Sequence, residues 1–294
     1  MVRTGLAAAG AACLLVAGLV IGCDRVERTG GWSGHGGEVN WGGVHVHQGD
    51  GDRGDGGDRG DGDRGERSEV IAELPGITAV HLDRTDGDVV VRHVAGGRGE
   101  VRERSRDRPA GAEPLHRVED GVLVLPGCPD DCSVDYEVDL PAAVPVDGTG
   151  AAGAVEVDGM AAAQVEAGAG EVRISGVPGP VRVRSGAGGI ELHELGGDVE
   201  VSTGTGRIDG EGLAGGTVVA DARTGSIDLE LTAPRAVRAE TGTGTVELEV
   251  PDGAYRVDAR AGLGSADVEV PTDPGSPRRL ELRSGTGSVR VSAG

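Results

Sequence analysis

The second half of the chain repeats one short glycine-containing phrase at a nearly constant interval. The phrase reads Gly-x-Gly-x, followed by an aliphatic residue, a charged residue and a second small or aliphatic residue. Its copies begin at Gly168, Gly186, Gly204, Arg223, Gly242, Gly262 and Gly285, with Arg223 in place of the first glycine in one copy. The second glycines, at 170, 188, 206, 225, 244, 264 and 287, are separated by 18, 18, 19, 19, 20 and 23 residues. A period near 20 residues with a strand-like core predicts a stacked, solenoidal architecture.

Each period contains two segments in which apolar residues alternate with polar ones. Val172 and Ile174 follow one glycine turn, and Val181 and Val183 precede the next. This alternation predicts two short strands per period, with a corner at the glycines, which reach positive φ without a Cβ clash. Strands this short must stack to share a core, so we expect an all-β chain that forms a parallel β-solenoid without helices. An antiparallel β-sandwich is the alternative fold.

The phrase is not a dinucleotide-binding loop. Such a loop leads from a strand into a helix whose N-terminus holds the pyrophosphate. Here every copy leads into another strand. The glycines therefore predict turns and not a phosphate site, and we expect no cofactor.

Residues 1–22 resemble a bacterial lipoprotein signal peptide. Arg3 precedes an apolar run from Leu6 to Ile21, and Gly22 stands before Cys23. The run is short for a membrane span, and small residues at its end suit cleavage. The resemblance implies that Cys23 is lipidated. The chain would then be exported and anchored to the outer face of the cytoplasmic membrane, at the cell surface or in the periplasm. An uncleaved anchor and an ordinary signal peptide are the alternatives.

The composition of residues 23–69 predicts a disordered tether. The stretch from Asp50 to Arg64 consists of Asp, Gly and Arg alone, so it has no apolar surface to bury. The domain expected beyond it spans residues 70–294, with an irregular front half at 70–150 and regular coils at 151–294.

Two cysteines remain in that domain, four positions apart. Cys128 and Cys132 enclose a tight loop, and in an exported protein this spacing predicts a disulfide. A zinc site would need further ligands, and no histidine lies close by in the sequence. We therefore expect no metal there.

Charge excludes one class of partner and marks one surface. The formal net charge is −21, and all 28 basic residues are arginine, so nucleic acid is not an expected partner. The outward residue of each repeat is acidic in five successive copies: Glu191, Asp209, Asp228, Glu247 and Asp267. With coils about 4.8 Å apart, these acids would form one ladder. The ladder is either a solvated face that deters lateral pairing or a docking strip for divalent cations or a basic partner.

The companion strand gives a ladder of mixed sign. The outward positions predicted for it are Glu166, Arg182, Glu200, Ala220, Arg238, Asp258 and Glu281.

The front half carries the features of a known family. These are Gly87-Asp88-Val89, the Asp-Gly-Val-Leu strand at 120–123, the Leu140-Pro141 junction and the serial glycine coils. Over residues 70–294 the chain resembles the bacterial "putative adhesin" domains of unknown function. The resemblance implies a β-helical envelope protein without a catalytic motif, which binds an envelope protein or a polysaccharide or has a structural role. Some members accompany envelope-stress systems, so a sensor or accessory role is the alternative.

Two further expectations concern chemistry and assembly. No catalytic signature occurs, and a polysaccharide-acting β-helix enzyme is the less favoured function, for which the loop at 98–118 is the one candidate wall of a pocket. The final segment, Ser288 to Gly294, has no polar cap after it. Because solenoids normally need caps, we expect weak self-association through this C-terminal rung.

Overall fold

The computed structural model describes residues 39–41, 44–47, 67–109, 112–129 and 132–294. The signal peptide, Cys23 and most of the expected tether lie outside these residues. Within the described part of the chain, no helix is long and apolar enough to span a bilayer.

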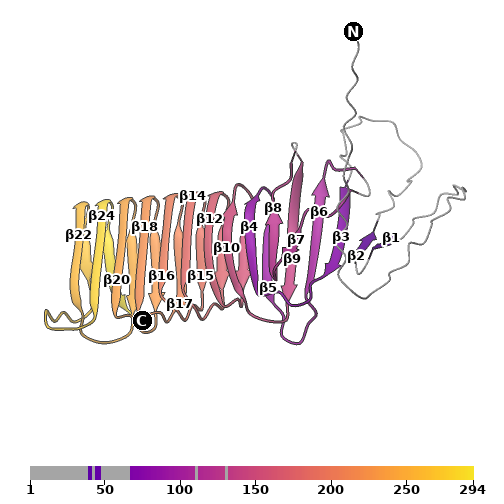
Figure 1. Cartoon of the computed structure of the whole chain (residues 1–294). Coiled ribbons are helices and arrows are strands. Elements are labelled where there is room, and N and C mark those ends of the chain that lie inside the picture. Colours follow the sequence, from indigo (N-terminus) through magenta and orange to yellow (C-terminus); the bar gives the residue numbers. More distant parts are fainter. Residues whose placement is uncertain (1–38, 42–43, 48–66, 110–111, 130–131) are drawn as a thin grey trace, which may run out of the picture. The chain divides into compact units, whose positions relative to one another are not determined.

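Two large β-sheets make up the solenoid, and their strands stand side by side along the stack in Figure 1. Sheet A has 14 strands in the spatial order β1 (Val39–Trp41), β2 (Val44–His47), β3 (Arg67–Glu73), β6 (Glu100–Arg106), β9 (Ser133–Leu140), β5 (Val89–His93), β11 (Val155–Asp158), β13 (Val172–Ser175), β15 (Ile190–His193), β17 (Ile208–Leu213), β19 (Ile227–Leu231), β21 (Val246–Val250), β25 (Val289–Ala293) and β23 (Ala266–Val268). Sheet B has 11 strands in the order β22 (Arg256–Leu263), β24 (Arg279–Thr286), β20 (Ala236–Thr243), β18 (Thr217–Thr224), β16 (Val199–Thr205), β14 (Val181–Ala187), β12 (Ala162–Ala169), β10 (Pro145–Gly150), β4 (Ala79–Thr85), β8 (Val122–Pro126) and β7 (Arg117–Glu119).

From β10 onward each coil gives one strand to each sheet. Neighbouring coils pair in parallel and in register, so that Ile190, Ile208 and Ile227 form one inward row. The inward side chains are mostly Val, Ile, Leu and Ala and are almost completely buried. The parallel β-solenoid expected from the repeat is confirmed, and the sandwich alternative is excluded. Among the described strands, antiparallel pairing is confined to β1, β2, β3, β6 and β9 in sheet A and to β7 and β8 in sheet B.

The second glycine of each phrase forms the corner between the two sheets. At Gly225 and Gly244 φ is 138° and 144°, a region that favours glycine. A Cβ on Gly225 would also clash with the carbonyl oxygen of Gly206 in the coil below. The corner therefore requires glycine both for the turn and for the close approach of stacked backbones.

In the front half, the order of the coils along the stack differs from their order in the sequence. Strands β8 and β9 form a coil that lies outside the coil of β4 and β5. Beyond it, β6 runs antiparallel to β9 and turns Glu103 inward. The Glu103 carboxylate, 1% exposed, accepts hydrogen bonds from the backbone N–H groups of Leu115 and His116. His116 Nδ1 lies 2.9 Å from it and Arg108 Nη1 3.3 Å. Residues 112–117 therefore close this end of the core.

The last coil does not follow its predecessor. Strands β24 and β25 are inserted between the coil of β20 and β21 and the coil of β22 and β23 (Figure 1). The expectation that residues 288–294 form the open end of the stack is therefore wrong, because β25 has a neighbour on each side. The open end is formed by β22 and β23. Insertion buries Leu280 and Leu282 and leaves Val257 and Ala259 in the terminal rung, so less apolar surface meets water.

Part of the expected tether is ordered into strands. Strand β2 pairs antiparallel with β3, with Val44 opposite Ala72 and Val46 opposite Val70. Strand β3 itself begins at Arg67, three residues before the expected domain start. Sheet A therefore extends beyond β3 through a segment that the sequence assigned to the tether.

Candidate functional site

The outer face of sheet B carries a shallow groove formed by four strands. Because side chains alternate along a strand, every second residue of β12, β14, β16 and β18 points outward. The strand register sets Gln164, Arg182 and Glu200 in one row. A second row contains Glu166, Arg184, Ser202 and Asp221. Together these rows line a hollow of about 150 Å³.

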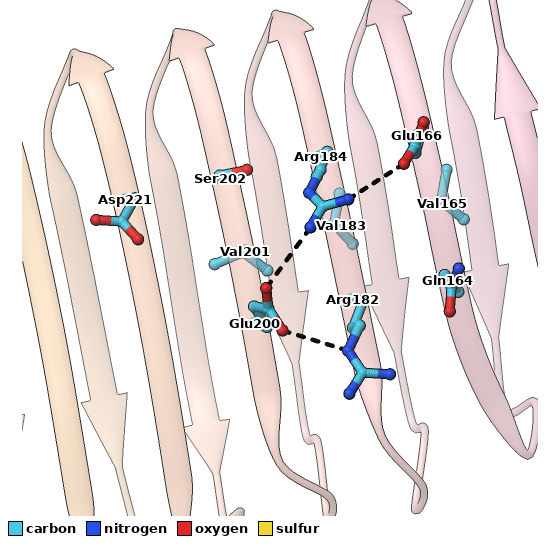
Figure 2. A pocket seen from close by; sticks show the side chains of 10 residues that line it. All are labelled: Gln164, Val165, Glu166, Arg182, Val183, Arg184, Glu200, Val201, Ser202 and Asp221. Atoms are coloured by element: carbon cyan, nitrogen blue, oxygen red, sulfur yellow. Dashed lines mark hydrogen bonds and ion pairs between the residues drawn. The ribbon is translucent and has the colours of Figure 1, made fainter.

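Ion pairs across the strands hold the two arginines of the groove. Arg184 Nη1 lies 3.3 Å from Glu166 Oε1, and Arg184 Nη2 lies 3.8 Å from Glu200 Oε1. Arg182 Nε lies 3.3 Å from Glu200 Oε2. Figure 2 shows Arg184 reaching from β14 toward an acid on each neighbouring strand. These side chains are all more than half exposed, so their pairs add little stability and stay open to exchange with a ligand.

Asp221 differs from the other acids of the groove. Figure 2 shows its carboxylate apart from the paired groups, and among the described residues no hydrogen bond or ion pair reaches it. Burial raises the pKa of this carboxyl, Arg238 lowers it, and the charges of Glu240 and Glu200 raise it further. An acceptor that is partly withdrawn from water and lacks a donor favours a ligand that brings hydroxyl or amino groups.

The groove continues toward the corner of the solenoid. A broader hollow of about 640 Å³ runs from Glu166 and Asp221 to the row of first glycines. In that row Gly186, Gly204 and Gly242 have no side chain, and Arg223 is the one residue of the row whose side chain projects from the surface. The one substituted glycine of the repeat is therefore a charged group at the edge of the groove.

The acidic ladder on sheet A is shorter than the sequence indicated. Glu191, Asp209, Asp228 and Glu247 pair in register, as expected. Arg290 then lies between Glu247 and Asp267, because the last coil is inserted there. The prediction of five successive acids is wrong at Asp267 for this topological reason.

Arginines neutralise much of this ladder. Arg207 Nη2 lies 2.8 Å from Asp209 and 3.0 Å from Asp228, and Arg173 Nη2 lies 2.6 Å from Glu191. The hydrogen bond from Arg173 holds the pKa of Glu191 below its usual value.

Burial raises the pKa of Asp228 by more than the charge of Arg207 lowers it. The charges of Glu247 and Asp209 raise this pKa further. A hollow of about 290 Å³ lies beside these acids. In the described residues no group of three or more His, Cys, Asp or Glu side chains is arranged to hold a metal ion.

The companion ladder also differs from its prediction. Val219, and not Ala220, stands outward in β18, and Gln164 replaces Glu166 in the row of Arg182 and Glu200. The strand register keeps one outward position in every coil, six residues before the second glycine: Gln164 before Gly170, Arg182 before Gly188 and Val219 before Gly225. The assignments of Glu166 and Ala220 are two residues and one residue off that position. Sequence reasoning missed Asp221, which stands in a second outward row four residues before the second glycine. Its alternation with the buried Ala220 and Ala222 was the signal that could have identified it.

Cys128 and Cys132 are joined by a disulfide, with their Cα atoms 5.4 Å apart. The bridge lies in the loop between β8 and β9, where Asp86 accepts a hydrogen bond from the Cys128 N–H. It fixes a connection in the front half, away from the groove.

Comparison with known proteins identifies the fold. A crystal structure from Bacteroides fragilis, described as a putative adhesin, matches with a TM-score of 0.50 at 13% identity, covering 77% of this chain and 97% of that one. The fold is shared with that protein. A putative adhesin from Parabacteroides distasonis matches at 12% identity with a TM-score of 0.45, covering 79% of this chain and 98% of that one. No family model matches the chain. No curated protein matches it either.

Proposed function

We propose that the chain is a non-catalytic binding module of the bacterial envelope, which holds an envelope polysaccharide in the groove of sheet B. Asp221 carries this proposal, because its carboxylate is partly buried, has no donor among the described residues and stands beside Ser202. Sugar hydroxyl or amino groups would satisfy it. The likeness of the fold to a solved protein described as an adhesin supports a binding role.

The geometry of the groove suits a polymer. Equivalent positions recur on each strand at about 4.8 Å, so polar contacts repeat along the stack. Both tyrosines, Tyr136 and Tyr255, are buried, and the described surface therefore offers no tyrosine on which a sugar ring could stack. Recognition would rest on arginine, carboxylate and hydroxyl groups instead. The groove is also shallow and its rows contain no histidine, which supports binding more than acid–base catalysis.

Binding of labelled envelope polysaccharide to the Asp221→Asn variant tests this site. We expect the dissociation constant to be roughly tenfold larger, a loss of about 1.4 kcal/mol in binding free energy, because the strongest acceptor of the groove is lost. Glu156→Gln, an outward acid of β11 on the other sheet, is the matched control and should bind like the wild type. Equal binding by Asp221→Asn and the wild type would refute the assignment of the groove.

Display outside the cytoplasmic membrane is part of the same proposal. Lipidation of Cys23 would attach the chain to the membrane, with the segment after it as a tether. The Cys23→Ala variant should lose incorporation of labelled fatty acid and appear in the soluble fraction. Retention in the membrane with no lipid label in the wild type would instead indicate an uncleaved anchor.

A further inference from the structure

The two ends of the solenoid are closed to different degrees. At the front, residues 112–117 are hydrogen-bonded to the inward carboxylate of Glu103 and cover the core. At the other end, β22 and β23 pair on one side only, with β24 and β25. No described strand pairs with their outer edge, and only residues 271–273 bond to the chain there, at Tyr255 just before β22.

Exposure confirms that the core is open at this rung. The inward Val268 is 37% exposed, whereas its partner Val291 in the inserted coil is fully buried, as are Leu280 and Leu282. The inward residues Val257, Ala259 and Ala261 are only partly covered. An uncapped rung with apolar side chains and unpaired backbone groups is a template for a further strand.

The backbone of β22 defines which groups are free. The N–H of Arg256 donates to the carbonyl oxygen of Arg278, on the side of β24. Because backbone groups alternate along a strand, the N–H and C=O groups of Val257, Ala259 and Ala261 point to the open edge. Three consecutive edge-facing residues can each donate and accept in an antiparallel pair.

The charges of β22 select a second copy of the same strand and one register. Its outward residues are Arg256, Asp258 and Arg260. Antiparallel pairing about a two-fold axis at Ala259 places Asp258 opposite Arg260 of the partner subunit, and the same contact occurs twice by symmetry. An axis at Asp258 would place Arg256 opposite Arg260 of the partner subunit. An axis at Arg260 would place the two copies of this arginine opposite each other, so both of these registers bring like charges together.

We propose that two copies of the chain associate end to end, with β22 of each pairing antiparallel about Ala259. Val257 then faces Ala261 of the partner subunit, so the two open cores meet and both rungs are covered. Within one chain Arg260 Nε lies 2.8 Å from Asp258 Oδ1, so both side chains are already held on the outward face at this edge.

A charge-exchange series in sedimentation equilibrium tests the interface, using the full chain with Cys23→Ala to remove any association through lipid. We expect a concentration-dependent dimer. Asp258→Arg should weaken it at least tenfold by setting arginine against arginine, and Asp258→Arg/Arg260→Asp should restore it to within about threefold. Thermal unfolding of each variant verifies the fold, because these exposed positions leave the core unchanged.

Three outcomes would overturn the proposal. The first is a strictly monomeric wild type across the concentration series. The second is a dimer that Asp258→Arg leaves intact, and the third is a folded double variant that stays monomeric.

Discussion

At the scale of the residue, the two glycines of the repeated phrase have different roles. The second has positive φ in every regular coil and touches the coil below it, whereas the first is replaced by Arg223 in one copy. Position in the phrase therefore determines which glycine is required. Both the spacing and the corner were predictable from sequence, because the requirement is local.

Replacement of Gly225 by alanine tests this distinction. Because the φ of 138° is unfavourable for alanine and its Cβ would meet the Gly206 carbonyl, we expect a loss of at least about 2 kcal/mol in the free energy of unfolding. Thr224→Ala, the exposed neighbour, should change it by less than about 0.5 kcal/mol. Urea denaturation measures both, and an unchanged midpoint for Gly225→Ala would contradict the account of the corner.

Asp228 gives a pH-dependent prediction. Its folded-state pKa is raised, mainly by burial, so the folded state binds protons more tightly than the unfolded chain there. The penalty from the charged carboxylate is therefore absent below the unfolded pKa and appears as pH rises through the folded pKa. We expect Asp228→Asn to be more stable than the wild type at neutral pH, with the difference shrinking toward acid pH.

Unfolding midpoints measured from neutral to acid pH provide the comparison. Glu230→Gln, an exposed acid of the same strand, serves as the control for the loss of one negative charge. A constant difference between Asp228→Asn and the wild type at all pH values would show that the carboxylate does not titrate in this range.

At the scale of the element, the insertion of the last coil is the main departure from the repeat. Val237 pairs with Leu280, and Leu280 pairs with Val257, so the terminal coil and the inserted coil have the same register. Nothing in the spacing distinguishes the two orders, which is why the sequence alone led to the wrong open end and the wrong fifth acid. Burial decides between them: exposing Leu280 and Leu282 in place of Val257 and Ala259 would cost on the order of 2–3 kcal/mol.

Paired cysteines can establish the order of the coils directly. Thr243, Thr286 and Leu263 occupy one exposed row, with Thr286 in the middle. Neighbours in the row are about 4.8 Å apart and the outer two about twice that distance. We expect oxidation to join Thr243→Cys with Thr286→Cys, and Thr286→Cys with Leu263→Cys. Thr243→Cys should not join Leu263→Cys in a monomer. Efficient formation of that bridge would show that the coils stack in the order of the sequence, without the insertion.

At the scale of the whole molecule, the sequence was informative about architecture and less so about the site. A parallel solenoid follows from periodicity and alternating burial, which are properties of the chain itself. The groove is formed by the outward residues of β12 to β18 that lie four and six positions before the second glycine of each coil. The repeat could have placed Asp221 in this row, but its burial and its lack of a partner depend on the neighbouring strands.

Residue-resolved labelling of carboxyl groups, with and without envelope polysaccharide, tests the proposed binding surface most directly. The exposed acids of both sheets report in one mass-spectrometric experiment, so the ladder of sheet A is an internal control. We predict that the ligand protects Glu166, Glu200 and Asp221 from labelling and leaves Asp209 and Glu247 unchanged. Protection confined to Asp209 and Glu247 would place binding on the opposite sheet and contradict the account.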